Sequence, residues 1–369
     1  MRFAADENNT KITGRTIYRD GVRYLGYTGS SVSFRFKGKT AKVELVSDAS
    51  IHEKRDYAWV AVFVKEEKDN EISYGAAADE EPYKRFCLDK DEAEYVLYES
   101  DEEKTVTVTL IKYSEAEYAA CGIKWIETDS EEILTPPAAK KLKIEMVGDS
   151  ITCGYGNEGG VEETQHDTSK ENPMGAYSLL TATHLDADVN VVAWNGKGVI
   201  TAYIGEDAPK VKDADWLVPM LYEYTDAGCE RDYLHTPEDK WEKWDNSNFI
   251  PDIITVYLGT NDASYTDNDA ARNEEFVNGY TKFLGTIRSK NPEIPILCML
   301  GTMDKRLCGS VERAVELFNS KNNTDNVYYL ELPFQDEADG LSINWHPTVK
   351  THRKTAEIVE KKIIEILKK

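Results

Sequence analysis

The sequence of 369 residues predicts two domains of different fold class. Residues 1–127 are expected to form an all-β sandwich of jelly-roll type, and residues 140–369 an α/β domain around a parallel sheet of about five strands. Short apolar–polar alternations with frequent turn signals fill the first part of the chain. Strand-like runs alternate with long helical patterns in the second part, and a polar stretch with two prolines separates the parts. The length also exceeds that of one ordinary domain.

The sandwich prediction depends on period-two alternation. Apolar and polar residues alternate in the runs that begin at Val32, Ala41 and Val106. The run from Tyr57 to Val64 is apolar on both faces, as a central strand would be. Turn signals such as Arg19-Asp20-Gly21 and Lys37-Gly38-Lys39 interrupt these runs at short spacing. Many short strands without long helices favour an antiparallel sandwich.

A linker is expected over residues 128–139. This stretch is polar and contains the pair Pro136-Pro137, which cannot continue a sheet ladder.

The second part has the pattern of a parallel sheet covered by helices on both faces. The expected strands are Leu142–Val147, Val189–Ala193, Asp252–Leu258, Ile296–Leu300 and Val327–Leu330. The expected helices are Gly175–Leu185, Ala270–Ser289, Ser310–Asn319 and Thr348–Leu367.

Charge and hydropathy exclude several function classes. The balance of 44 Lys and Arg against 67 Asp and Glu gives a net charge of −23, which disfavours nucleic acid and anionic membranes as partners. No apolar stretch approaches the ~20 residues of a membrane helix. The N-terminal residues contain no apolar segment of signal-peptide type, so a cytoplasmic location is expected unless a leader has been lost.

The six cysteines show neither a C-x-x-C pair nor zinc-type spacing. We therefore expect free, mostly buried thiols in a reducing compartment. The histidines also lack partners at metal-ligand spacing, so the sequence predicts neither a metal nor another cofactor.

Four short polar blocks stand at the carboxyl ends of expected strands or in the loops after them. They are Gly148-Asp149-Ser150, Ala193–Gly198, Leu258–Asp262 and Asn344–Thr348. Because open α/β sheets bind ligands at this edge, we expect the four blocks to meet there.

Together the blocks supply what acyl transfer requires. Ser150 is the candidate nucleophile and His346 the candidate base, since a serine needs a neighbouring base to take its proton. The backbone N–H groups of Ser150 and Gly196 and the side-chain amide of Asn261 are the candidate oxyanion hole. Gly196 suits this role because its unhindered backbone lets a ligand approach closely.

In this order, the four blocks resemble those of the SGNH hydrolase superfamily, also called GDSL esterases. Gly148-Asp149-Ser150 matches the first block of that superfamily, and Gly259–Asp262 matches its Gly-x-Asn-Asp block. A β-sandwich before such a domain, together with the run Gly148–Gly156 and with Trp345-His346-Pro347, looks more narrowly like carbohydrate esterase family 2. The resemblance implies a serine esterase that removes O-acetyl groups from oligo- or polysaccharides of the xylan and mannan type.

One departure from the superfamily pattern concerns the group that orients the base. The usual Asp three residues before the histidine is replaced by Ile343, and Asn344 follows it. The family 2 branch implies that a backbone carbonyl can hold the histidine instead. We therefore expect a Ser150–His346 dyad, with His346 oriented by the main-chain carbonyl of Asn344. Asp339 is the alternative acid if the loop folds back.

Supporting, substrate-binding or packing roles are expected for the remaining candidates. Asp149 is expected to support Ser150 by hydrogen-bonding the loop backbone. Trp345, next to the base, is a candidate wall of the acyl pocket, and Trp194 a candidate platform for a sugar ring. His352 is expected to be a surface or packing residue.

Two other functions stay open at this stage: an SGNH lipase or thioesterase for longer acyl chains, and a carbohydrate-binding protein whose hydrolase half is degenerate. A conventional α/β-hydrolase is excluded, because the serine block lacks the closing glycine of Gly-x-Ser-x-Gly. The sequence leaves the oligomeric state open.

Overall fold

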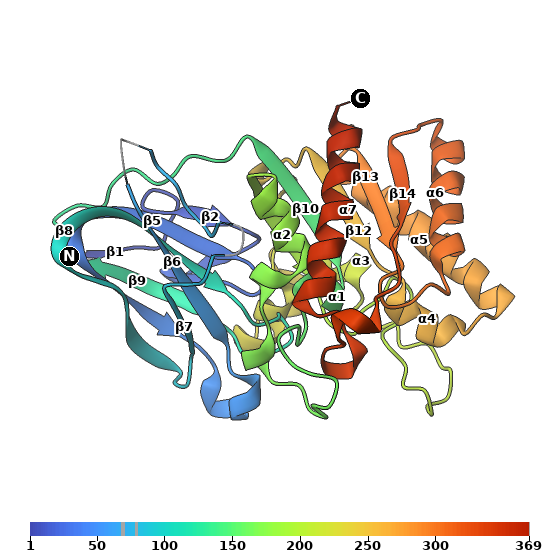
Figure 1. Ribbon diagram of the computed structural model, residues 1–369, viewed down its shortest axis with the longest axis horizontal. Coiled ribbons are helices and arrows are strands. Elements are labelled where there is room, and N and C mark those ends of the chain that lie inside the picture. Colours follow the sequence, from blue (N-terminus) through green and yellow to red (C-terminus); the bar gives the residue numbers. More distant parts are fainter. Residues whose placement is uncertain (68–70, 78–79, 369) are drawn as a thin grey trace.

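The computed structural model describes residues 1–67, 71–77 and 80–368, and it contains two sheets that lie side by side (Figure 1). Residues 68–70 and 78–79, inside the predicted sandwich domain, and residue 369 lie outside the described residues.

The first sheet has nine antiparallel strands in the order β3-β4-β9-β5-β8-β6-β7, with β1 on β9 and β2 on β5. The strands are β1 (Arg2–Phe3), β2 (Lys11–Thr13), β3 (Ile17–Arg19), β4 (Val22–Tyr24), β5 (Ser31–Val46), β6 (Trp59–Glu66), β7 (Lys84–Cys87), β8 (Glu92–Lys112) and β9 (Gly122–Thr128).

The long strand β5 shows how this sheet encloses a core. Its register shifts between Gly38 and Thr40, and the parity of the inward-facing residues changes there. One core receives side chains from both halves of the strand: Val32, Phe34 and Phe36 before the shift, and Ala41, Val43 and Leu45 after it. The sheet therefore folds over a single core, and the predicted all-β fold of the N-terminal domain is confirmed.

The predicted linker lies between the end of β9 at Thr128 and the start of β10 at Leu142. It is attached to the first sheet, because Leu134 forms a bridge with Arg35. The guanidinium of Arg35 also donates a hydrogen bond to the carbonyl of Thr135.

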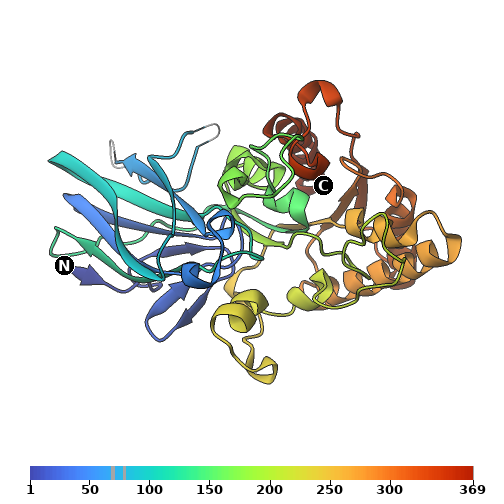
Figure 2. The same cartoon turned by 90° about the horizontal axis from the view of Figure 1, so that it is seen from below.

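The second sheet has five parallel strands in the order β11-β10-β12-β13-β14, so the predicted α/β class is confirmed. The strands are β10 (Leu142–Gly148), β11 (Ala187–Ala193), β12 (Ile253–Tyr257), β13 (Ile296–Leu300) and β14 (Val327–Glu331). The helices are α1 (Ser150–Cys153), α2 (Tyr177–His184), α3 (Val218–Leu221), α4 (Thr260–Thr266), α5 (Ala270–Lys290), α6 (Cys308–Asn322) and α7 (Val349–Leu367). Helices α2 and α7 lie on one face of the sheet, and α5 and α6 on the other (Figure 2).

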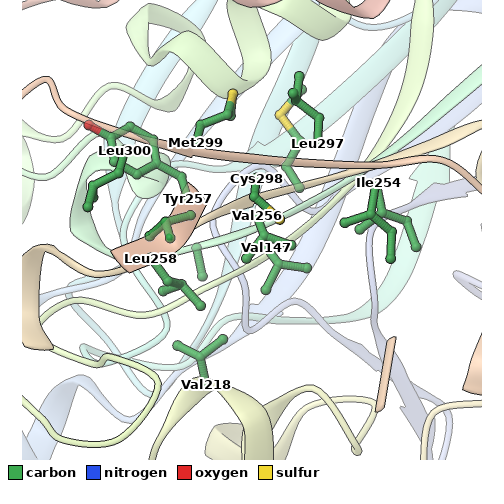
Figure 3. Close-up of a cluster of buried hydrophobic side chains, with 14 of the residues drawn as sticks. Val147, Val218, Ile254, Val256, Tyr257, Leu258, Leu297, Cys298, Met299 and Leu300 are labelled. Atoms are coloured by element: carbon green, nitrogen blue, oxygen red, sulfur yellow. The ribbon is translucent and has the colours of Figure 1, made fainter. Parts of the chain in front are cut away.

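The core of the second domain forms where these strands lie next to one another. Figure 3 shows Val147 of β10, Val256 of β12 and Cys298 of β13 side by side in one cluster of apolar residues. Each of these side chains is at most 1% exposed. Strands buried on both faces are typical of a parallel sheet between two helix layers.

A buried ion pair joins the two domains. Arg15 and Glu145, on β10, are 0% and 2% exposed, and Nη2 of Arg15 lies 2.9 Å from Oε1 of Glu145. Arg15 also donates hydrogen bonds to the carbonyls of Tyr222 and Tyr224. Buried charges of this kind are stable only when they are paired and hydrogen-bonded.

Candidate active site

All four sequence blocks meet at the carboxyl edge of the parallel sheet, and three of them directly follow neighbouring strands. Gly148 at the end of β10 is in register with Ala193 on β11 and with Tyr257 on β12. The loops that follow these strands carry Ser150, Gly196 and Asn261, so neighbouring strands deliver all three to one edge.

Ser150 is the first residue of the short helix α1. The Asp149 side chain caps this helix, because its Oδ1 accepts a hydrogen bond from the N–H of Ile151 at 3.1 Å. Gly148 permits the tight strand-to-helix turn: a Cβ at that position would lie 2.0 Å from Oγ1 of Thr152. The turn leaves Ser150 only 5% exposed.

His346 lies within hydrogen-bond distance of Ser150, with 2.9 Å between its Nε2 and the serine Oγ. The other ring nitrogen, Nδ1, lies 3.0 Å from the carbonyl oxygen of Ile343. Since a carbonyl can only accept, Nδ1 carries the proton and Nε2 is free to accept the proton of the serine. This is the geometry of a nucleophile with its base.

The group that orients the ring includes one residue that the sequence did not predict. Nδ1 lies 3.0 Å from the carbonyl oxygen of Ile343, and the predicted carbonyl of Asn344 also favours the protonated ring. The reason is the backbone, since Asn344 and Trp345 both adopt left-handed conformations, with φ of 52° and 59°. This tight turn brings the carbonyl of Ile343 back under the ring three residues later.

The alternative acid, Asp339, is also wrong. Its carboxylate forms ion pairs with Lys350 and Lys354 on α7. These lysines lower the pKa of Asp339 and hold its carboxylate away from the imidazole.

Burial lowers the pKa of His346 to about 4, although the carbonyls of Ile343 and Asn344 partly oppose this effect. The imidazole is therefore neutral at physiological pH, which is the form that a general base requires.

The three candidate oxyanion donors differ in how they are placed. The N–H of Ser150 is in the first turn of α1, where no intrahelical acceptor exists. Gly196 has φ of 69°, and a Cβ there would meet nothing within 4 Å. The amide of Asn261 donates to Oδ2 of Asp149 at 3.3 Å and to the carbonyl of Lys197 at 3.1 Å. An oxyanion would compete with these two acceptors for Asn261.

Asp262 is a supporting residue that the sequence analysis did not single out. It is fully buried, and its carboxylate accepts hydrogen bonds from the backbone N–H groups of Val199, Ile200 and Thr201. Burial raises its pKa to about 6 and that of Asp149 to about 7. The signal was present in the Gly-Thr-Asn-Asp block, where the second acid follows the candidate oxyanion asparagine.

Tyr155 is a second neighbour of the base that the sequence analysis missed, although it lies inside the run Gly148–Gly156. Its ring centroid is 4.5 Å from that of His346, and its hydroxyl accepts a hydrogen bond from Nδ2 of Asn344 at 3.1 Å.

The two tryptophans proposed for substrate binding have different outcomes. Trp194 cannot offer a face to a sugar ring, because it is only 2% exposed and packs edge-on against Trp216 at 5.6 Å. This prediction was wrong: an apolar ring directly after a buried strand is core. Trp345 is 62% exposed beside His346, so its role in substrate binding stays a prediction.

The remaining candidates have structural roles. His352 is 1% exposed and accepts a hydrogen bond from the N–H of Tyr177, which agrees with packing and not with a surface position.

In residues 1–67, 71–77 and 80–368, no three His, Cys, Asp or Glu side chains are grouped so as to bind a metal ion. The same described residues include no helix with the length and hydrophobicity to cross a membrane.

A serine and a neutral histidine at the carboxyl edge of a five-stranded parallel sheet define a serine hydrolase of the SGNH type. Residues 146–354, more than half of the chain, match the GDSL-like Lipase/Acylhydrolase family, and the chain belongs to that family. Residues 12–137 match the carbohydrate esterase 2 N-terminal family. The resemblance to carbohydrate esterase family 2 is thereby confirmed over both domains.

Characterised relatives are similar along almost the whole chain. Cellulase/esterase CelE of Acetivibrio thermocellus is 28% identical over 95% of this chain, which spans only 39% of that relative. An acetylxylan esterase / glucomannan deacetylase of Cellvibrio japonicus is 26% identical, over 99% of this chain and 91% of the relative. The structure of a family two carbohydrate esterase from Clostridium thermocellum in complex with cellohexaose has a TM-score of 0.79 and 27% identity. It covers 97% of this chain and 99% of that one.

Proposed function

We propose that this protein is a carbohydrate O-acetyl esterase that acts through a Ser150–His346 dyad. The observation that carries the proposal is the pair of contacts on His346, with Nε2 at 2.9 Å from Ser150 and Nδ1 at 3.0 Å from a carbonyl. The names of the relatives, an esterase and an acetylxylan esterase / glucomannan deacetylase, support the choice of substrate class.

In the proposed reaction, Oγ of Ser150 attacks the acetyl carbonyl carbon while Nε2 of His346 takes the hydroxyl proton. The carbonyl oxygen gains the negative charge, and the N–H groups of Ser150, Gly196 and Asn261 are the proposed donors to it. Collapse of this intermediate breaks the bond to the sugar oxygen, which leaves with the proton from Nε2.

Water completes the cycle. His346 takes a proton from a water molecule, the resulting hydroxide attacks the acetyl-serine, and acetate leaves as Ser150 recovers its proton. The carbonyl of Ile343 keeps the ring in the correct tautomer, but as a neutral group it stabilises the imidazolium less than a carboxylate would.

We also propose a cytoplasmic location, as expected from the sequence. All six cysteines are free thiols, which supports a reducing compartment, and acetylated oligosaccharides would then be more suitable substrates than an intact polymer.

The experiment measures acetate released from acetylated xylo- and manno-oligosaccharides and from an aryl acetate, for the parent and for Ser150→Ala. We expect release by the parent and a loss of at least about a thousandfold in Ser150→Ala. Ser33→Ala is the matched control, because Ser33 is also buried and its hydroxyl forms a hydrogen bond with that of Thr109 in the first domain.

An aryl ester with a long acyl chain separates the alternatives. Faster hydrolysis of the long ester than of the acetate would favour a lipase or thioesterase. Carbohydrate binding without hydrolysis of any ester would favour a degenerate binding protein. Either result would overturn the proposed deacetylation.

A further inference from the structure

A turn of the N-terminal domain reaches the active site of the other domain. Residues 115–118 follow strand β8 and contact two parts of the candidate site. We call this segment the 115–118 turn.

The base of the turn is held rigidly. Lys112, at the end of β8, is 1% exposed, and its ammonium donates hydrogen bonds to the carbonyls of Ser114 and Glu115 at 2.9 and 2.8 Å. The N–H of Glu115 donates to Oε2 of the buried Glu171 at 2.8 Å. A buried ammonium with two fixed acceptors leaves this segment little freedom to move.

The turn forms two hydrogen bonds with the loop that carries Gly196, one of the proposed oxyanion donors. Oε2 of the fully buried Glu115 accepts a hydrogen bond from the N–H of Asn195 at 3.1 Å. Oε2 of Glu117 accepts another from Nδ2 of the same asparagine at 2.9 Å. The next residue is Gly196, which has no side chain, and its carbonyl accepts a hydrogen bond from the N–H of Tyr203 at 2.7 Å. Its N–H, on the side of Asn195, is therefore placed by this bond together with the two bonds that hold Asn195.

Glu115 also contacts the helix of the nucleophile. Cys153, the last residue of α1, lies beside the Glu115 carboxyl, and burial together with this carboxyl raises the pKa of its thiol. One carboxyl group thus lies next to both the loop of Gly196 and the helix that begins with Ser150.

The turn reaches the base as well, through a series of ring contacts that we call the stack: its first two contacts are stacked, and the last, between Tyr155 and His346, is tilted. Tyr118 lies 4.6 Å from His166, His166 lies 4.2 Å from Tyr155, and Tyr155 lies 4.5 Å from His346, measured between centroids. Oε1 of Glu171 lies 3.0 Å from Nε2 of His166, in the middle of this chain of rings.

We propose that the 115–118 turn is a positioning element of the active site: Glu115 places the Gly196 loop against α1, and Tyr118 supports the ring of His346 through His166 and Tyr155. The inference rests on the proposed function for its acetate readout only. These residues touch no reacting atom, so they act on geometry, and an error of about 1 Å in such a site costs up to about a hundredfold in rate.

The test compares Glu115→Ala, Glu115→Gln and the control Glu67→Ala. Glu67 is a largely buried carboxylate of the same domain, paired with Arg35 away from the site. The first readout is the rate at which a fluorophosphonate labels Ser150, and the second is kcat and KM for an aryl acetate. The labelling rate needs the dyad and the oxyanion hole but no carbohydrate.

We expect Glu115→Ala to lower the labelling rate and kcat about tenfold or more with little change in KM. Glu115→Gln retains an acceptor for Asn195 and should recover most of the rate, and Glu67→Ala should stay close to the parent. Parent-like rates in Glu115→Ala, or an equal loss in Glu67→Ala, would overturn the proposal. If the parent is labelled but cleaves no ester, the deacetylation proposal fails while labelling still decides this one.

A second pair covers the case in which Glu115→Ala does not fold. Tyr118→Phe retains the ring at the end of the stack and Tyr118→Ala removes it. We expect slower labelling only in Tyr118→Ala, and equal rates in the two variants would contradict the support of His346 by the stack.

Discussion

At the scale of single residues, His346 has no carboxylate partner among the described residues. A carbonyl fixes its tautomer, and burial keeps it neutral. The first of these follows from the left-handed pair Asn344 and Trp345, which turns the chain so that the carbonyl of Ile343 faces the ring.

The low pKa of His346 has a kinetic consequence. Because burial lowers this pKa from an ordinary 6.5 to about 4, the base loses its proton at lower pH and is active over a wider range. We expect kcat/KM for an aryl acetate to rise with pH through a midpoint near 4 and to be flat by about pH 6. The measurement is a pH profile of kcat/KM between about pH 3 and pH 8. A midpoint near 6.5 would show that the site is more solvated than the structure indicates.

The sequence could predict that Ser150, Gly196, Asn261 and His346 come together at one edge of the sheet, because each belongs to a block that lies close after a strand or before a helix. It predicted the carbonyl of Asn344 near the ring but not that of Ile343, because the φ angles of Asn344 and Trp345 have no sequence signature. It missed Asp262, whose partners are three backbone N–H groups some sixty residues away.

At the scale of elements, a side chain of helix α7 accepts a hydrogen bond from the first residue of helix α2. Tyr177 is the first residue of α2, and its N–H has no intrahelical acceptor. Nδ1 of His352, on α7, accepts this hydrogen bond at 3.2 Å. Burial lowers the pKa of His352 to about 3, and a protonated ring could no longer accept.

This contact predicts a pH-dependent stability. The folded-state pKa of His352 is below its unfolded value of about 6.5, so its contribution is complete above that pH and is lost as the pH falls. Relative to the parent, His352→Gln should therefore gain stability on acidification, by up to about 1.4 kcal/mol per pH unit. Urea unfolding of both proteins from about pH 7 to pH 4 measures the difference. A difference independent of pH would contradict this prediction.

Long periodic elements were predicted well, and short ones were not. Helix α5 starts at Ala270 as expected. Helix α4 was not predicted, because its sequence, Thr260–Thr266, is polar and lacks an apolar period. Contacts from other loops stabilise it, among them the bond between Ile204 N and Ser264 Oγ. Tertiary contacts of this kind cannot be read from local pattern.

At the scale of the whole molecule, the ion pair of Arg15 and Glu145 couples the two domains. Neither side chain is more than 2% exposed, so separation of the domains would also break the hydrogen bonds of Arg15 to Tyr222 and Tyr224.

Removing one partner of this pair leaves the other charged and buried. We expect Arg15→Met to lower the free energy of unfolding by about 3–5 kcal/mol. The double variant Arg15→Met, Glu145→Met should recover most of that loss, because no unpaired charge remains. Denaturant unfolding followed by fluorescence and circular dichroism measures both. An equal loss in the single and double variants would contradict the electrostatic cause.

The hydrogen bonds between the 115–118 turn and Asn195 also limit which domains of related proteins can be joined to each other. The linker around Pro136 is the obvious place to join domains from different relatives. A chimera joined there would take Glu115 and Tyr118 from one relative, and the Gly196 loop and the stacked rings from another. The contacts between them would then no longer match. The active site is therefore complete only when both domains come from the same protein. A catalytic domain transplanted alone would lack the contacts of the 115–118 turn.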